Sequence, residues 1–345
     1  MMGTDGQGSS WFGARIGWDA IRATLSTQRV ARRNFSHFLG GITLLLFLLE
    51  VGSGVLVLLY YRPDVTQAHA SLERIVGEVP YGDLIRNVHA WSSDLLVLSL
   101  LAHMFTVVVR GSFRSPRELS WWSGQALLVL CIGLAFTGAI LPWSQEAYLQ
   151  ARVGSELARY VPFVGNWLHH FLRGGDEVTS STLQHAFGFH VAALPAAATA
   201  LIALHLFFVQ RRAATAPRDD DTPTMPVYPD FLVRQAAAWT ATFVVVMTLA
   251  IFAQRSVGVA ADPRLPSVIG ARPPWYFLAF HQVVRGAPRE LLGLDGARFL
   301  VAAMCGVGLA VVALPLLDRR GSRLTAYLAW LFLLACALLS AYALS

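Results

Sequence analysis

Seven long apolar segments constrain the fold of this chain more than any other feature of its sequence. A helix of about 20 apolar residues crosses the roughly 30 Å hydrocarbon core of a bilayer. Backbone groups at that depth must be paired inside the protein, so we expect these segments to be α-helices. The sequence therefore predicts an all-α integral membrane protein, in keeping with its hydrophobic content of 55%. The expected helices span residues 35–60, 84–109, 121–142, 182–209, 232–254, 297–317 and 324–344.

A polar connector divides the chain into two helical blocks. We expect residues 1–33 to form an amphipathic segment on the cytoplasmic membrane surface. Residues 34–212 contain four of the predicted helices and residues 231–345 contain three. Residues 213–230 are polar and proline-rich, which is typical of a linker.

Two long loops separate helices on the predicted outer side. Residues 143–181 are expected to contain short interfacial helices near 146–160 and 164–172. Residues 256–296 contain the stretch ADPRLPSVIGARPPWYF. Ordered prolines and aromatic residues in such a loop indicate a built surface or site, although a merely solvated loop remains the alternative.

Arginines are concentrated at the segment ends that we assign to the cytoplasm. The positive-inside rule then places the N-terminus in the cytoplasm and the C-terminus outside the cell's inner (plasma) membrane. These flanks explain the net charge of +6, so we expect no nucleic-acid partner. We also expect no cleaved signal peptide. The arginines concerned are Arg29, Arg32, Arg33, Arg110, Arg114, Arg117, Arg211, Arg212, Arg319, Arg320 and Arg323.

Four histidines lie at regular spacing on two of the apolar segments. His89 and His103 are 14 residues apart, and His190 and His205 are 15 apart, which is about four helical turns. Two such helices packed together would present two facing histidine pairs at two membrane depths. Ionisable residues inside a span are usually functional. The chemistry that fits this pattern is bis-imidazole ligation of two stacked haems, and four unrelated hydrogen-bonded histidines are the alternative.

Four glycines repeat the same period on the two neighbouring segments. Gly40 and Gly54 are 14 residues apart, as are Gly124 and Gly138. Glycine lets helices approach closely, so we interpret these residues as clearance for a macrocycle inside the bundle. Ordinary helix packing by small residues remains the alternative.

Several phrases of the sequence resemble cytochrome b of the quinol-oxidising bc and b6f complexes. NFSHFLGGITLLLF, LIRNVHAW and FTGAILPW resemble the four-helix cytochrome b of the b6f type, which shares the 15-residue histidine step. PVYPDFL, ADPRLP and PPWYFLAFHQVVRGAPRELLG resemble the separate three-helix subunit IV. The resemblance covers about residues 30–300 and implies two b-type haems. It assigns His89 and His190 to the outer haem, and His103 and His205 to the inner haem.

The same resemblance implies roles for two arginines and one altered position. Arg86 would pair with a propionate of the outer haem, with a headgroup-binding arginine as the alternative. Arg114 has a similar role at the inner haem. The cysteine that attaches an additional haem in the b6f type falls at Phe38, so we expect no covalent attachment. A non-covalent third haem stays open.

The quinol-site motif of the family is changed in this chain. The family reads Pro-Glu-Trp-Tyr, and this sequence reads Pro273-Pro274-Trp275-Tyr276. Pro274 cannot accept a proton, although quinol oxidation releases two. His281 is a candidate proton acceptor, with an ordinary structural histidine as the alternative.

Two acids at membrane depth are further departures from the family. Glu50 and Asp94 stand where the relatives carry uncharged residues. Such acids are costly unless they have partners or water. A proton path and a satisfied buried polar group both remain open.

The resemblance implies a diheme subunit of a quinol-oxidising membrane complex. Quinol would dock between residues 143–181 and 273–285. One electron would pass to a Rieske-type iron–sulfur protein and on to a c-type cytochrome or plastocyanin-like acceptor. The other would cross through both haems to an inner quinone, with coupled proton translocation. The chain has no CxxC motif, so it would be active only with partner subunits, in a complex that the family implies to be homodimeric.

Two other functions remain as alternatives. A non-bifurcating diheme subunit would link the quinone pool to another outer redox enzyme, and the altered Pro274 is compatible with it. A proton-coupled transporter using Glu50 and Asp94 would contain no haem.

Overall fold

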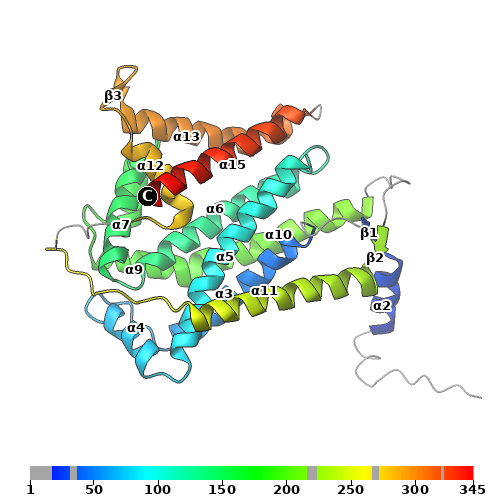
Figure 1. Cartoon of the computed structure of the whole chain (residues 1–345), viewed down its shortest axis with the longest axis horizontal. Coiled ribbons are helices and arrows are strands. Elements are labelled where there is room, and N and C mark those ends of the chain that lie inside the picture. The colour runs from blue at the N-terminus through cyan, green and yellow to red at the C-terminus, as the bar shows by residue number, and fades with distance from the viewer. Residues whose placement is uncertain (1–17, 32–36, 216–223, 266–271, 320–321, 345) are drawn as a thin grey trace, which may run out of the picture.

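The computed structural model describes residues 18–31, 37–215, 224–265, 272–319 and 322–344. Long helices lie side by side, and shorter helices gather at one end of them (Figure 1). Within these residues six helical stretches are long and apolar enough to cross a membrane. They are α3 (Leu39–Leu58), α5 (Gly82–Val109), α6 (Glu118–Ile140), the continuous α9–η2–α10 (Ser180–Arg211 as a span), η3–α11 (Val227–Phe252) and α15 (Arg323–Leu344).

The remaining predicted segment, 297–317, is divided into two helices. α13 (Gly296–Val312) is a shorter apolar helix, and α14 (Leu314–Leu317) follows it after Ala313. Pro315 lies in the first turn of α14, where proline is tolerated, but its missing N–H interrupts a longer helix. The chain is thus mostly helical, with six candidate spans and one shorter apolar helix, and the predicted fold class is confirmed.

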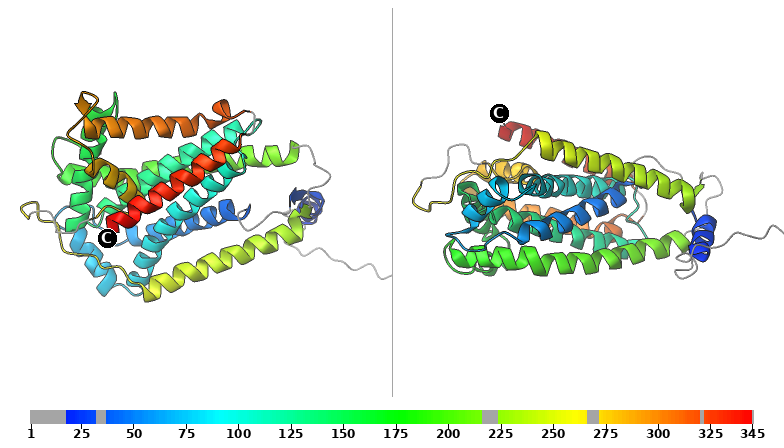
Figure 2. Two further views of the ribbon diagram at one scale, coloured as in Figure 1. Left: turned by 45° about the horizontal axis from the view of Figure 1, so that its top comes forward. Right: turned by 90° about the horizontal axis from the view of Figure 1, so that it is seen from below.

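Four helices form the bundle that carries the predicted histidines. α3 packs against α5, α6 packs against α10 (Leu194–Thr215), and α5 also contacts α6. α11 (Leu232–Phe252) packs on α5 and α3 from outside. The right view of Figure 2 shows α10 and α11 along opposite sides of the molecule. Leu46, Leu96, Ala198 and Val246 bring α3, α5, α10 and α11 into one buried cluster. None of the span of α15 is buried, as expected for a helix that faces lipid.

Short helices cover one end of the bundle, which we call the α7 end (Figure 1). α7 (Gln145–Ala158) and α8 (Gly165–Arg173) agree closely with the interfacial helices expected at 146–160 and 164–172. α4 (Ala68–Gly77) was not predicted, although its apolar face packs Leu72 and Ile75 against Trp143. The other elements here are α9 (Ser180–Gly188), η4 (Trp275–Phe277), α12 (Leu278–Arg285), β3 (Glu290–Leu291) and β4 (Leu294–Asp295).

The opposite end, the α2 end, joins the two blocks of the sequence. α2 (Trp18–Thr27) lies within the predicted amphipathic segment, and residues 1–17 lie outside the described residues. β1 (Arg29–Ala31) pairs antiparallel with β2 (Thr224–Pro226), and η3 (Val227–Phe231) leads into α11. This pairing was not predicted, because it joins residues almost 200 positions apart.

Candidate functional site

The structure brings the four predicted histidines together in two pairs. The rings of His89 on α5 and His190 have centroids 6.1 Å apart and planes at 89°. His103 on α5 and His205 on α10 are close enough to interact electrostatically. From their positions along the helices, the first pair lies nearer the α7 end and the second nearer the α2 end.

A wider helical turn explains the unequal spacing of the histidines. His190 lies in η2 (Phe189–Ala193), a π-helical turn between α9 and α10. Such a turn contains one extra residue and is frequent at functional sites. The 15-residue interval from His190 to His205 therefore covers about the same rise and rotation as the regular 14-residue interval on α5. Pro195 follows this turn and lacks an N–H donor, which favours the local irregularity.

Hydrogen bonds fix the orientation of three of the four imidazoles through Nδ1. The Nδ1 atom lies 3.0 Å from Ser53 Oγ in His89, 2.9 Å from Ser123 Oγ in His205, and 3.0 Å from the Leu134 carbonyl oxygen in His190. Ser53 and Ser123 already donate to the carbonyls of Leu49 and Leu119, so each hydroxyl oxygen accepts from its imidazole. These rings therefore carry the proton on Nδ1 and a lone pair on Nε2.

The second nitrogen of each ring is left available. Among the described residues, no hydrogen bond reaches Nε2 of the four histidines, and Nδ1 of His103 is buried without a partner. Two imidazole nitrogens about 2 Å from a shared metal ion place their ring centroids roughly 6 Å apart. The separation of 6.1 Å between His89 and His190 matches this arrangement.

Each predicted glycine lies against one imidazole ring. A Cβ atom at Gly138 would clash with its imidazole, and a Cβ atom at each of the other three glycines would make a contact tighter than most real side chains show, so glycine gives the rings their room on α3 and α6. The distances from this added Cβ atom to the imidazole atom Cε1 are 2.5 Å for Gly138 at His190, 3.1 Å for Gly54 at His89, 3.3 Å for Gly40 at His103 and 3.3 Å for Gly124 at His205.

The hydroxyl residues that contact the Nδ1 atoms were not predicted, although the sequence contains a signal for them next to the glycines. Ser53, Ser123 and Thr137 each precede one of the glycines directly, and the Thr137 hydroxyl is 3.3 Å from His190 Nδ1. The fourth glycine, Gly40, follows Leu39 instead, and its imidazole is the one whose Nδ1 has no partner. A hydroxyl residue before the glycine thus predicts which ring is held.

The two predicted arginines have protein partners. Arg86 donates hydrogen bonds to the carbonyl oxygens of Arg255 and Ser256, just beyond the end of α11. Arg114 forms an ion pair of 2.8 Å with Asp318 at the α2 end. Arg86 also donates to Asn87 Oδ1 at 3.5 Å, so three of its five N–H donors have partners among the described residues and two are left for an anion.

The position of the attached haem in b6f-type relatives is filled by aromatic packing. Phe38 is buried and stacks on Phe231 with centroids 5.6 Å apart. A Cβ atom at Gly41 would stand 2.4 Å from the Gln235 amide, and Trp239 donates to the Gly41 carbonyl. α3 and α11 are in direct contact here.

The altered motif lies against α5. Trp275 Nε1 donates to Asp94 Oδ1 at 3.1 Å, and Arg255 forms an ion pair with Asp94 Oδ2. Burial, reinforced by the negative charge of Asp94, raises the pKa of Tyr276. His281 lies farther along on α12, where partial burial and the charge of Arg285 lower its pKa.

Glu50, the other acid at membrane depth, lies beside His89 and not at the motif loop. Ser92 donates a hydrogen bond to Glu50 Oε1, and Glu50 Oε2 lies 3.4 Å from His89 Nδ1. Glu50 and Asp94 are thus both satisfied polar groups with different surroundings.

The two predicted outer loops contact one another. The Gln145 N–H donates to the Val259 carbonyl at 2.8 Å, and the Ala261 N–H donates to the Trp143 carbonyl at 3.1 Å. The start of α7 therefore holds the segment that leads to the motif loop.

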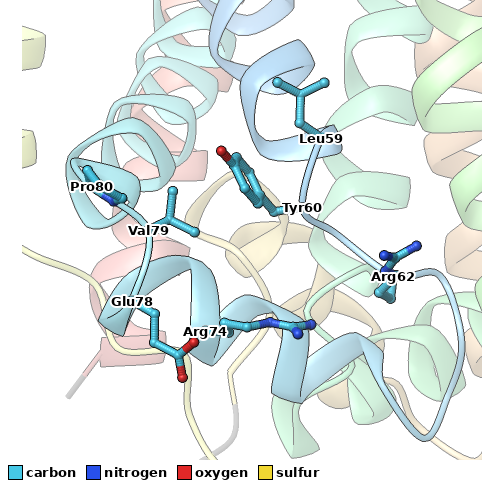
Figure 3. A pocket seen from close by; sticks show the side chains of 7 residues that line it. All are labelled: Leu59, Tyr60, Arg62, Arg74, Glu78, Val79 and Pro80. Atoms are coloured by element: carbon cyan, nitrogen blue, oxygen red, sulfur yellow. The ribbon is translucent and has the colours of Figure 1, made fainter.

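A hollow of about 350 Å³ lies elsewhere, between the end of α3 and α4 (Figure 3). None of the predicted site residues lines it. Its lining residues are Leu59, Tyr60, Arg62, Arg74, Glu78, Val79 and Pro80.

Fold and site together define a helical membrane protein whose bundle holds two half-buried pairs of facing imidazoles. The family described as Cytochrome b/b6/petB matches residues 25–213, and the family described as Cytochrome b(C-terminal)/b6/petD matches residues 260–344. The chain belongs to the cytochrome b/b6 family. It is an integral membrane electron-transfer protein of a family that carries b-type haems.

Individual relatives cover most of the chain. The "Cytochrome bc complex cytochrome b subunit" of Chlorobaculum thiosulfatiphilum is 36% identical over 295 residues, which cover 84% of this chain and 68% of that protein. Cytochrome b6 of Prochlorococcus marinus (strain MIT 9303) is 35% identical over 208 residues, which cover 60% of this chain and 95% of that protein. A solved structure titled "Hyperthermophilic respiratory Complex III" matches with a TM-score of 0.84 at 25% identity, covering 97% of this chain and 91% of that chain.

Proposed function

We propose that this chain is the diheme cytochrome b subunit of a quinol-oxidising bc-type complex. His89 and His190 hold the haem nearer the α7 end, and His103 and His205 hold the haem nearer the α2 end. The observation that carries the proposal is the pairing of four imidazoles whose Nε2 atoms have no protein partner. When bound, the two haems supply one-electron redox centres at two depths of the membrane.

The protein residues prepare the imidazoles for ligation. Ser53 and Ser123 accept hydrogen bonds from Nδ1, which directs the lone pair of Nε2 away from the serine. The four glycines keep the neighbouring helices clear of the rings. Arg86 provides guanidinium donors for a propionate at the α7 end.

Quinol oxidation takes place at the α7 end in this proposal, between α7 and the loop 273–285. Two electrons leave the quinol: one goes to a Rieske-type iron–sulfur protein that serves a c-type cytochrome or plastocyanin-like acceptor, and one crosses to a quinone at the α2 end. Transfer of one charge across the membrane corresponds to about 2.3 kcal/mol per 100 mV, which couples the crossing to energy conservation. The relative from Chlorobaculum, named as a subunit of a bc complex, supports the need for partner subunits. The homodimeric state of the complex is part of the proposal.

The proposal also includes the orientation in the membrane and the roles of the two helical blocks. The α7 end faces outward and the α2 end faces the cytoplasm, with residues 34–212 carrying the histidines and residues 231–345 carrying the quinol loop. A non-bifurcating diheme subunit is the second candidate, and Pro274 is the residue that favours it. The transporter alternative, which predicts no haem, is disfavoured by the match to the cytochrome b/b6 family.

The test uses the purified complex with its partner subunits. We expect a reduced-minus-oxidised spectrum with two b-type haems, and we expect His89→Ala to remove one of them selectively. Quinol together with an inhibitor of the inner quinone site should accumulate reduced haem only when the iron–sulfur partner is present. Two haems retained in the variant would refute the ligand assignment, and haem reduction without the iron–sulfur partner would favour the second candidate.

A further inference from the structure

A carboxylate from the bundle stands at the loop whose own carboxylate is replaced by Pro274. Asp94 lies on α5, and its Oδ1 accepts a hydrogen bond of 3.1 Å from the indole of Trp275, the next residue of the altered motif. We propose that Asp94 accepts a proton from the bound quinol during its oxidation, in place of the acid missing at position 274. This inference rests on the proposed quinol-oxidising function.

The position of the carboxylate is fixed by three parts of the chain. Arg255, just beyond α11, forms an ion pair with Asp94 Oδ2. The Arg255 guanidinium also lies 4.0 Å from the centroid of the Trp91 ring, and the Trp91 indole donates to the Ala253 carbonyl at 2.8 Å. With Trp275 on the other oxygen, the carboxylate is held at the junction of α5, the end of α11 and the motif loop.

The carboxylate remains accessible to a ligand. The Asp94 side chain is 22% exposed, and Trp275 is 39% exposed. An ionised carboxylate offers about four acceptor positions, of which Arg255 and Trp275 use two. The quinol hydroxyl can therefore donate to Asp94 without breaking either contact. Glu50 cannot take this role, because its oxygens are directed at Ser92 and His89.

The charged and titratable groups around Asp94 favour it as the acceptor. The positive charge of Arg255 compensates the negative charge of Asp94. An isolated acid at this depth would lack such a partner. Burial raises the pKa of Tyr276, and the charge of Asp94 raises it further, so this phenol keeps its proton and does not act as a base. Glu50 on α3 is the other acid within electrostatic reach.

The quinol becomes a quinone by losing two electrons and two protons. The electrons would go to the oxidised iron–sulfur centre of a partner subunit and to the ferric b-type haem that His89 and His190 would hold. One quinol O–H bond breaks as an O–H bond forms on Asp94, and the second proton leaves to water on the α7 side. Withdrawal of an electron makes the quinol hydroxyl more acidic, which lets a carboxylate paired with Arg255 take the proton.

The main test is Asp94→Asn in the assembled complex, with a short-chain quinol as substrate. Asparagine keeps the size and an acceptor oxygen for Trp275 but removes the base. We expect quinol oxidation to fall by about 100-fold, with an unchanged dithionite-reduced haem spectrum, and we expect Asp94→Glu to recover most of the rate. Asp83→Asn removes another acid from α5 and serves as the matched control, with a rate within twofold of the unmodified complex. A normal rate in Asp94→Asn would overturn the proposal.

A second pair of variants separates proton acceptance from a structural ion pair. Asp94→Ala creates space, so added acetate should restore part of the rate in proportion to its concentration. Arg255→Gln keeps the carboxylate and should retain at least tenfold more activity than Asp94→Asn. Equal losses in Arg255→Gln and Asp94→Asn, without rescue by acetate, would overturn the proposal. If Asp94→Asn fails to retain haem, the acetate rescue and the Arg255→Gln rate decide.

The outcomes distinguish this inference from the function on which it rests. An unmodified complex that shows no quinol-dependent haem reduction refutes the proposed function. An unmodified complex that oxidises quinol while Asp94→Asn does so equally well refutes the role of Asp94 alone.

Discussion

The two ends of the molecule each contain an arginine–aspartate pair, and the pairs differ in how completely they are satisfied. At the α2 end Asp318 is 7% exposed and accepts from Arg114, Ser322 and Thr325. At the α7 end Asp94 is 22% exposed, and among the described residues it accepts from Arg255 and Trp275 alone. A saturated, covered carboxylate stabilises a junction between helices, whereas an accessible one beside a loop can still act on a ligand. The comparison separates an ion pair that holds the fold from one suited to chemistry.

The histidine pairs at the same two ends differ in a parallel way. His89 has Ser53 and Glu50 beside its Nδ1, whereas Nδ1 of His103 is buried with no partner. A carboxylate next to a ligating imidazole raises the basicity of the ligand and tunes the metal. In the proposed function, the α7 end therefore combines the accessible Asp94 with a ligating imidazole that has an acid beside it.

The largest difference between the two levels is expected from the glycines. Gly138→Ala places a Cβ atom 2.5 Å from His190, so we expect loss of the haem nearer the α7 end. Gly124→Ala is the matched change at the other level, where 3.3 Å to His205 can be relieved by a small shift. Haem content measured by difference spectroscopy checks both. Equal retention of both haems in Gly138→Ala would contradict the proposed fit.

A smaller difference concerns the electronic properties of the two haems. Glu50→Gln removes the ionisable group beside His89, so at a pH where Glu50 carries its charge the reduction potential of the haem proposed at that level should rise. The potential of the haem held by His103 and His205 should stay constant, which provides an internal control. A redox titration followed at the haem bands measures both values. Unchanged potentials in Glu50→Gln would show that the acid exerts no electrostatic effect on its neighbour.

His281 offers a weaker effect at the α7 end. Its pKa is lowered by partial burial and by Arg285, so the imidazole is neutral near pH 7 and can accept a proton. A base of this kind becomes protonated as the pH falls through its pKa, below the ordinary value of about 6.5. If His281 accepts the second proton, His281→Phe should slow quinol oxidation severalfold and remove the decline in rate at acidic pH. The pH profile of the variant complex, compared with that of the unmodified complex, measures this.

The smallest effect is expected at the ion pair between Arg114 and Asp318. Burial alone would raise the pKa of Asp318, but hydrogen bonds from Thr325, Arg114 and Ser322 outweigh it and lower the pKa to about 2. An aspartate with a depressed pKa stabilises the fold above its unfolded value near 4, and this stability is lost as the pH falls towards 2. Asp318→Asn should lower the thermal midpoint in detergent by about 2–4 °C at pH 7 and have little effect near pH 2, with quinol oxidation preserved. A large loss of activity would remove the contrast with Asp94.

Periodicity made much of this architecture predictable. Spans such as Leu39–Leu58 follow from apolar length alone, and two facing histidine pairs followed from the similar spacings of 14 and 15 residues on two helices. The family resemblance then indicated that His89 pairs with His190. The π-turn around His190 was not predicted, because a single extra residue leaves almost no trace in an apolar pattern.

The contacts that assemble the loop site were beyond the reach of local patterns. Trp275 and Asp94 are separated by 181 residues, and Arg114 and Asp318 by 204. Each such pair depends on how whole helices pack, and no spacing rule encodes it. Both Glu50 and Asp94 were recognised as unusual from the sequence, but only the three-dimensional structure assigns one to an imidazole and the other to the loop.

The short ladder between β1 and β2 has a consequence for how the polypeptide can be divided. It pairs β1 with β2, which leads into α11, so backbone hydrogen bonds as well as helix contacts hold the two blocks together. Cleavage between Thr215 and Thr224 should therefore yield two fragments that stay associated. If the two blocks were encoded by separate genes, the pairing of β1 with β2 would help the two polypeptides to associate in the membrane.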